Sequence, residues 1–186
     1  LFATLTEPIR IHATREMIEI LERDIFNWSV YPRFSELSNE HGAVVAYHEF
    51  ERGAEIRVRD FSVRSVGVNH PVSACGYVIS DHSGSIAITG DTSETDEFWE
   101  VCNSTPNLTA VLVECAFPDE LVDLASVSDH LTPLRLKGEI AKLEDRDTPV
   151  FVINMKPMYR ETVIKQIEEA NLPNVNILEV GKIYEF

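Results

Sequence analysis

The sequence is poor in cysteine, and its three cysteines, Cys75, Cys102 and Cys115, fit the spacing of no zinc knuckle or disulfide framework. We therefore expect buried, reduced thiols. The sequence also lacks an apolar run near the roughly 18 residues of a membrane span, and it does not open with a basic segment followed by an apolar core. These absences predict a soluble, cytoplasmic protein that has no membrane partner.

Basic residues are scarce as well. Lys and Arg together number 16 against 31 Asp and Glu, which gives a formal net charge of -15. Such a surface repels a long polyanion unless a local basic groove overcomes the field. The charge argues against nucleic acid as the main partner and favours a small molecule.

What remains is an ordinary globular composition, with 44% hydrophobic and 25% charged residues in a chain of 186. Because no repeat, linker or low-complexity segment interrupts it, we expect a single domain over residues 1–186. The chain opens at Leu1, with a loop and then a strand, rather than at a methionine. We therefore expect further sequence before it.

The apolar periodicity in the first half predicts one helix and then several strands. Thr14 can cap a helix over residues 15–26, which follows a short strand at residues 8–12. After a loop, the period shortens toward two, with turn signals at Arg52-Gly53 and in "DHSG". The expected strands, mostly antiparallel, cover residues 43–50, 54–68, 75–81 and 85–89.

The second half alternates helices and strands. Helices are expected near residues 95–101, 119–125 and 160–170, and another begins with Thr132 as cap and Pro133 at its first position. The runs "AVLVEC" and "PVFVIN" are apolar without alternation, as in strands covered on both faces. A strand at residues 175–180 and a hairpin through Gly181-Lys182 close the chain. The pattern predicts an α/β layered domain with a mixed sheet.

Polar side chains stand just beyond several of these strands: His70, Asp91, Glu114 and Asn154, with His130 added from a loop. Each has a structural reading, since a histidine after a strand is commonly a bonded loop residue and an aspartate in "GDT" can hold a turn. Together they indicate a site at the strand ends. Carboxylate and imidazole suit a divalent ion such as Zn, Mn or Fe.

Five ordered motifs carry a resemblance: "VNHPVSACGYVI", "ITGDTSETDEFWE", "LVECAFPDE", "SDHLTP" and "FVINMKPMYRETVI". They resemble the second half of the metallo-β-lactamase superfamily, and within it they are most similar to the class II cyclic nucleotide phosphodiesterases. The resemblance implies an αβ/βα sandwich with mixed sheets and a two-metal site at one edge, here as a C-terminal portion without the N-terminal part.

The resemblance also implies roles for individual residues. His70 matches a histidine that binds one metal, and Asp91 matches the carboxylate that bridges two zinc, or manganese or iron, ions. His130 matches a histidine that serves as general acid or orients the phosphate. Glu114 matches an acidic residue after the strand that does not bind the metal itself but lies next to the residues that do. A hydroxide between the metals would attack phosphorus while the metals stabilise the developing charge.

Two features depart from the family. Its first ligand cluster, H-x-H-x-D-H, is absent, because His12, His41 and His48 do not have that spacing. Asn154 stands where the family has a histidine before "MKP", and an amide oxygen is a poorer zinc ligand than imidazole. We therefore expect a weakened or empty second metal site. Lys156 is a candidate to neutralise substrate phosphate, or else simply packs its stem at a strand-helix corner.

Three functions follow from the sequence as hypotheses. The first is a metal-dependent phosphodiesterase acting on 3',5'-cyclic nucleotides such as cAMP or cGMP. The second is a catalytically impaired or non-enzymatic binding or structural module of the same fold. The third is an RNA-processing nuclease, against which the net charge argues. Half a sandwich would expose an apolar sheet face, so we expect an N-terminal segment or a homo-oligomer partner to cover it.

Overall fold

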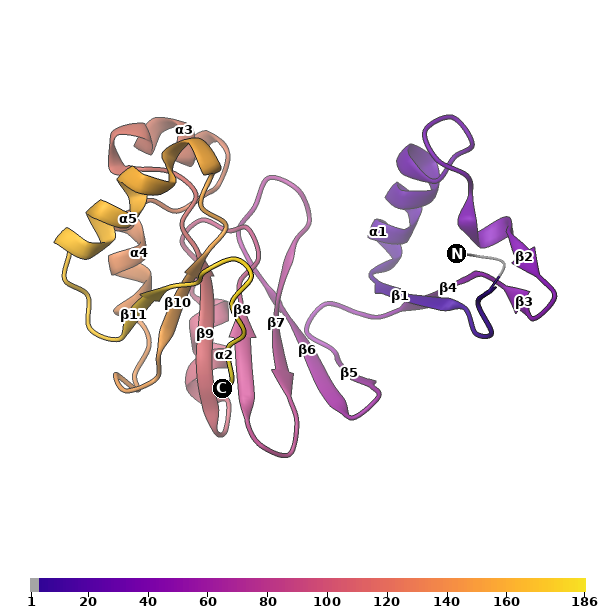
Figure 1. Cartoon of the computed structure of the whole chain (residues 1–186), viewed down its shortest axis with the longest axis horizontal. Helices are drawn as coiled ribbons and strands as arrows, with labels where there is room; N and C mark the ends of the chain where they lie inside the picture. The colour runs from indigo at the N-terminus through magenta and orange to yellow at the C-terminus, as the bar shows by residue number, and fades with distance from the viewer. Residues whose placement is uncertain (1–3) are drawn as a thin grey trace. The chain divides into compact units, whose positions relative to one another are not determined.

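The structure is a computed structural model that describes residues 4–186, so the loop expected at Leu1 lies outside the described residues. Contacts divide the chain into two compact units, Leu1–Ala54 and Glu55–Phe186, and each is described by itself (Figure 1). The single domain expected over residues 1–186 stays a prediction. No helix in the described part of the chain is both long and apolar enough to cross a membrane.

The first unit is a small α/β unit. Its strand β1 (Ile9–Ala13) pairs in parallel with β4 (Val45–Glu49), and β2 (Ser38–Asn39) pairs antiparallel with β3 (Gly42–Ala43). A 3-10 turn, η3 (Phe34–Glu36), precedes β2. The parallel register sets His12 opposite His48, and their rings stack with centroids 4.8 Å apart.

The helix of this unit begins where the sequence predicts. The Thr14 side chain accepts a hydrogen bond from the backbone N of Met17 at 3.4 Å, which confirms it as the cap of α1 (Arg15–Ile20). The expectation of one α-helix over residues 15–26 is wrong in its second half. The chain continues as a π-helix, η2 (Leu21–Ile25), in which the N of Phe26 bonds to the carbonyl of Leu21.

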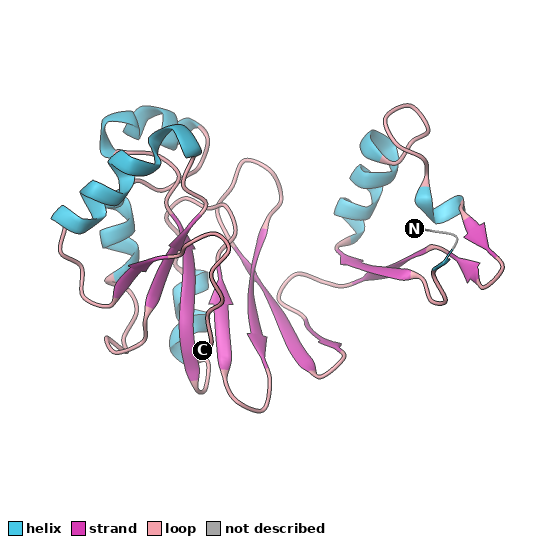
Figure 2. Ribbon diagram, in the orientation of Figure 1, coloured by secondary structure: helices cyan, strands magenta, loops and turns pink. Residues whose placement is uncertain are grey.

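The second unit holds a seven-stranded sheet in the order β11-β10-β9-β8-β7-β6-β5 (Figure 2). Neighbours from β5 to β8 are antiparallel, and those from β8 to β11 are parallel, which confirms the predicted mixed sheet. The strands are β5 (Glu55–Val58), β6 (Phe61–Gly67), β7 (Cys75–Ser80), β8 (Ser85–Ile88), β9 (Leu108–Glu114), β10 (Val150–Ile153) and β11 (Val175–Ile177).

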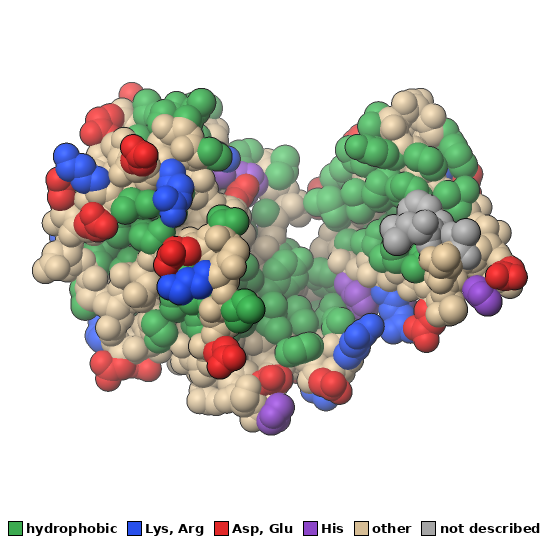
Figure 3. Space-filling view, viewed as in Figure 1, with side chains coloured by type: hydrophobic (Ala, Val, Ile, Leu, Met, Phe, Trp, Pro, Cys, Tyr) green, Lys and Arg blue, Asp and Glu red, His purple; other side chains and the backbone are tan. Residues whose placement is uncertain are grey.

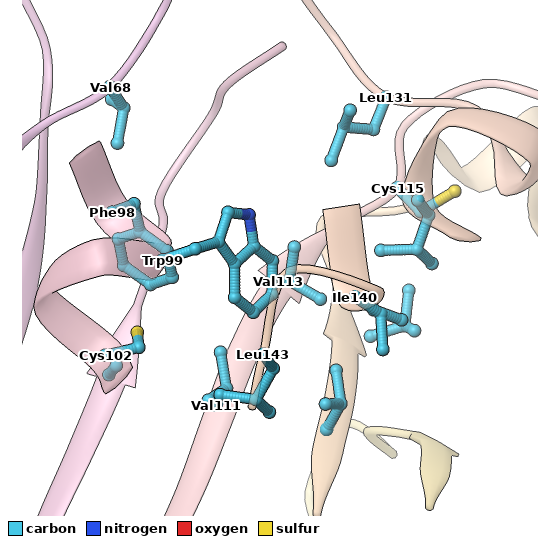
Figure 4. Close-up of a cluster of buried hydrophobic side chains, with 14 of the residues drawn as sticks. Val68, Phe98, Trp99, Cys102, Val111, Val113, Cys115, Leu131, Ile140 and Leu143 are labelled. Atoms are coloured by element: carbon cyan, nitrogen blue, oxygen red, sulfur yellow. The ribbon is translucent and has the colours of Figure 1, made fainter. Parts of the chain in front are cut away.

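Helices cover one face of this sheet and form the core with it. They are α2 (Glu97–Ser104), α4 (Pro133–Ile140) and α5 (Arg160–Glu169). The short helix α3 (Val122–Val127) instead packs its Ala125 in a separate cluster with Ala116 and Phe117, and 3-10 turns lie at η4 (Asp119–Leu121) and η5 (Pro157–Tyr159). Phe98 and Trp99 of α2 join Val111 and Val113 of β9 in one buried cluster (Figure 4). Burial of such side chains is the main term that stabilises the unit.

The opposite face of the sheet is apolar and only half-buried. Ile79, Ile86, Ile88 and Leu112 alternate with the buried core residues, and Figure 3 shows hydrophobic side chains gathered over β6 and β7. The ring of Phe151 on this face packs edge to face against that of Phe186, with centroids 5.1 Å apart. The expected full cover of β9 and β10 on both faces is therefore wrong, because their second face is only partly shielded. That an N-terminal segment or a homo-oligomer partner covers this face stays a prediction.

Two local expectations are also wrong. The closing hairpin through Gly181 does not form, since residues 178–186 contain a turn but no strand. Pro133 does begin α4, but the Thr132 side chain forms no cap. The carboxylate of Asp119 accepts from the N of Leu134 at 2.9 Å and satisfies that end of the helix instead.

The cysteines are free thiols. Cys102 and Cys115 are buried as expected, whereas Cys75 is only half-buried. Burial raises the pKa of Cys102 to about 12. Burial, with smaller effects from Glu114 and Asp119, raises the pKa of Cys115 well above its ordinary value. Both buried side chains therefore stay protonated near neutral pH and are not thiolate ligands.

Candidate metal centre

Asp91 lies in a short loop after β8 that hydrogen bonds hold in place. Gly90 takes a φ of 65°, a left-handed conformation that suits glycine and turns the chain out of the strand. The N of Ser93 then bonds to the carbonyl of Asn69, and the N of Asn69 to the hydroxyl of Thr92. These bonds join the loop after β8 to the loop after β6. They place the half-buried Asp91 near the segment that carries His70.

A buried carboxylate also holds the segment after Asp91 in place. It belongs to Glu139 of α4, which is 2% exposed. One of its oxygens accepts from the N of Thr95 at 3.0 Å and from the indole N of Trp99 at 2.7 Å. Its other oxygen pairs with Lys142 at 2.7 Å. We refer to this set of bonds as the Glu139 staple.

Glu114, the last residue of β9, is fully buried, and both of its carboxylate oxygens accept hydrogen bonds. Its Oε1 accepts from the N of Thr92 at 3.0 Å and lies 2.6 Å from Nδ1 of His130. Its Oε2 accepts from the N of Leu131 at 3.3 Å. A buried carboxylate with three donors is well satisfied, so Glu114 orients its neighbours.

The two histidines have the same hydrogen-bonding arrangement. Nδ1 of His130 donates to the Glu114 carboxylate, and Nδ1 of His70 lies 3.3 Å from the carbonyl oxygen of Asp129, which can only accept. Each neutral ring therefore carries its hydrogen on Nδ1 and offers a lone pair on Nε2. The rings meet edge to face, with centroids 5.3 Å apart. In each histidine, Nε2 is thus the ring nitrogen whose lone pair is available to an ion or a substrate.

Potential ligand atoms of Asp91, Glu114 and His130 all lie within 4.8 Å of one another. Although Glu114 belongs to this group by distance, its Oε1 already accepts two hydrogen bonds and its side chain is fully buried. That Glu114 stands behind the ligands, as the resemblance implied, stays a prediction. Within this group, Asp91 and His130 are left to face an ion or a substrate. His70 is not part of the group, although its ring adjoins that of His130.

Asn154 lies against Asp91 in a way that the sequence did not indicate. It directly follows β10 with a φ of 55°, and its Nδ2 donates to Oδ1 of Asp91 at 2.6 Å. The structure thus brings these two predicted residues together, but with the amide as a hydrogen-bond donor. Lys156 lies farther along, with its Nζ 5.9 Å from the centre of the Phe117 ring.

Sequence reasoning missed the residues that support this site. Thr92 and Leu131 donate backbone N–H groups to Glu114, and the Thr89 hydroxyl accepts from the N of Glu114. Phe117 packs against the His130 ring at 5.6 Å. The threonine of "GDT" was a visible signal, whereas backbone donors and packing contacts leave no mark in a sequence.

Comparisons with known proteins bear on this geometry. No protein-family model matches the chain. A probable 3',5'-cyclic-nucleotide phosphodiesterase of Yersinia pestis is 22% identical over 95% of the chain and 60% of that protein. Unliganded yeast PDE1 superposes with a TM-score of 0.73 at 20% identity, over 91% of the chain and 57% of PDE1. The metallo-β-lactamase fold protein YhfI of Bacillus subtilis superposes with a TM-score of 0.69 at 18% identity, over 94% of the chain and 64% of YhfI.

The chain has the metallo-β-lactamase fold. This confirms the fold expected from the five motifs. The chain spans about 60% of the length of the curated relative and 57% of PDE1. In this metallo-β-lactamase fold, Asp91 and Asn154 lie in the loops that leave the carboxyl ends of β8 and β10, where open α/β sheets bind ligands. His130 lies in the loop between α3 and α4 and reaches the same edge through its bond to Glu114 at the end of β9.

Proposed function

We propose that the protein is a metal-dependent phosphodiester hydrolase, with 3',5'-cyclic nucleotides as the first substrates to test. The observation that carries the proposal is the buried Glu114–His130 pair beside Asp91, in which no hydrogen bond engages Nε2 of His130 within residues 4–186. The similarity to a curated cyclic-nucleotide phosphodiesterase supports the choice of substrate.

The side chains suit a hard or borderline divalent ion, with zinc the first candidate and manganese or iron the others. Asp91 and Nε2 of His70 would hold the ion, and the Asp129 carbonyl would fix the orientation of the His70 ring. Few protein ligands leave positions open for substrate, as in catalytic rather than structural metal sites. When bound, the ion would act as a Lewis acid toward a phosphoryl oxygen and lower the pKa of water.

His130 would handle the proton. Glu114 holds Nδ1–H at 2.6 Å, so the exchangeable position is Nε2, which would first take up a proton from solvent and would then give it to the leaving oxygen of the phosphodiester. The buried carboxylate would hold the ring in the orientation and tautomer that this transfer needs, as the third member of a catalytic triad does. Lys156 is a candidate to neutralise the phosphate, because its Nζ lies 5.9 Å from the centre of the Phe117 ring, which packs against His130.

The test is hydrolysis of cAMP, cGMP and a linear phosphodiester by the purified chain with added Zn²⁺ or Mn²⁺. We expect Asp91→Asn to lower turnover by at least 100-fold and to weaken zinc binding in calorimetry. The matched control Asp123→Asn, on the exposed side of α3, should stay within twofold.

Three outcomes would contradict the proposal or its choice of substrate. Turnover that persists in chelator would show that no metal is needed. Failure of the chain to bind any divalent ion would favour the non-enzymatic module of the same fold. Salt-sensitive cleavage of precursor tRNA without cleavage of cyclic nucleotides would favour the nuclease hypothesis.

A further inference from the structure

Asn154 joins two distant parts of the second unit at the candidate site. It follows the last residue of β10 in a left-handed conformation, φ 55°, which asparagine tolerates better than most residues. Its side-chain amide reaches Asp91, 63 positions earlier in the sequence, and donates to Oδ1 at 2.6 Å. This is a short, charge-assisted hydrogen bond between two loops.

The bond changes what Asp91 can offer to cations. A carboxylate that joins two ions presents one oxygen to each of them. Here Oδ1 already accepts the Asn154 N–H, whereas no such bond engages Oδ2 among the described residues. A cation approaching Oδ1 from the side of β10 would meet the amide hydrogens, which carry partial positive charge.

Asn154 could itself bind an ion only by turning its amide. The group that faces Asp91 is Nδ2, which has no lone pair to give, and the amide oxygen is a weak ligand for zinc. Turning the amide would set its oxygen against the Asp91 carboxylate and break the 2.6 Å bond. The observed orientation therefore favours a donor that holds Asp91 in place.

We propose that Asn154 is a positioning residue for Asp91 and that the site accordingly takes one divalent ion per chain, through the oxygen that Asn154 leaves free. This inference rests on the proposed function, because it assumes that Asp91 binds a cation. Groups that orient a metal ligand typically contribute 10- to 100-fold to affinity.

The experiment measures the zinc stoichiometry of the purified chain by elemental analysis and its affinity by calorimetry, without reference to turnover. We expect one zinc per wild-type chain. Asn154→Ala should keep that stoichiometry and bind about 10-fold more weakly. Asn154→His, which exchanges the donor for an imidazole ligand, should raise the stoichiometry toward two.

The matched controls are Asn171→Ala and Asn171→His. Asn171 is also exposed and also left-handed, with a φ of 45°, so these variants report the backbone cost of losing asparagine there. Both controls should bind zinc within twofold of the wild type, and thermal unfolding should show that every variant is folded.

The outcomes separate the two proposals. Two zinc ions in the wild-type chain, or an Asn154→Ala variant that binds zinc as tightly as the wild type, would overturn the role of Asn154 and leave the proposed function standing. An absence of zinc, manganese and iron from the wild-type chain and from all folded variants would overturn both.

Discussion

The buried carboxylate of Glu114 allows a prediction whose size follows from its three hydrogen bonds. Glu114→Gln keeps the shape of the side chain. The glutamine oxygen can still accept from the N of Thr92 and from Nδ1 of His130, but its NH₂ must then face the N of Leu131. Two donors are thereby set against each other in a buried site.

The free energy of unfolding should fall by about 3 kcal/mol. A buried donor without a partner costs about 1–3 kcal/mol, and each of the two remaining bonds loses about 1 kcal/mol when its acceptor becomes neutral. Because glutamine is neutral, the variant no longer has the desolvation cost of a buried charge, and this gain offsets part of the loss. Glu114→Ala should cost more, about 4–5 kcal/mol, because all three donors lose their acceptor.

The assay is urea unfolding followed by tryptophan fluorescence. Trp99 is 2% exposed in the core of the second unit, whereas Trp28 in the first unit is 57% exposed, so the signal reports mainly on the second unit. The control is Glu120→Gln, an exposed carboxylate bonded to Gln166, which should change stability by less than about 0.5 kcal/mol. A Glu114→Gln protein as stable as this control, or as unstable as Glu114→Ala, would refute the reasoning.

Two further predictions concern other parts of the chain. Burial, then the charges of His48 and Arg10, lower the pKa of His12 below 6.5. The unfolded chain therefore binds the proton more tightly, and the stability of the first unit should fall as pH drops through about 6.5. NMR titration should show the pKa of His12 moving upward in His48→Gln, and an unchanged value would contradict the coupling. Gly76→Ala should destabilise the second unit by about 1–3 kcal/mol in thermal unfolding, because a Cβ there would lie 2.8 Å from the backbone oxygen of Ile88. An unchanged midpoint of thermal unfolding would show that β7 and β8 can move apart without cost to accommodate the Cβ.

Local signals predicted part of this fold well. Thr14 caps its helix because a cap depends on residues three positions apart. Pro133 begins α4 because its fixed φ suits a helix and the N–H that it lacks would have no partner in the first turn. The cap at Thr132 was wrong because Asp119, which is distant in sequence, supplies the acceptor. The terminal hairpin was wrong because a turn at Gly181 does not ensure that the segment after it pairs.

The candidate site shows the same limit. Ordered motifs indicated which residues gather at the strand ends, and the structure does bring Asp91, Glu114 and His130 together. Residue types alone could not show that Asn154 donates to Asp91, because an amide can present either its oxygen or its nitrogen. They also could not show how Glu114 divides its two oxygens among three donors.

The Glu139 staple has a consequence for the order in which the protein assembles. Glu139 lies 44 positions after Thr95, so the segment that follows Asp91 gains its anchor only when α4 has docked on the sheet. During synthesis, β5 to β9 leave the ribosome before that helix exists, and contacts over such long separations form late. A cation would therefore find its ligands in place only on the finished unit, where it would slow unfolding rather than guide early folding.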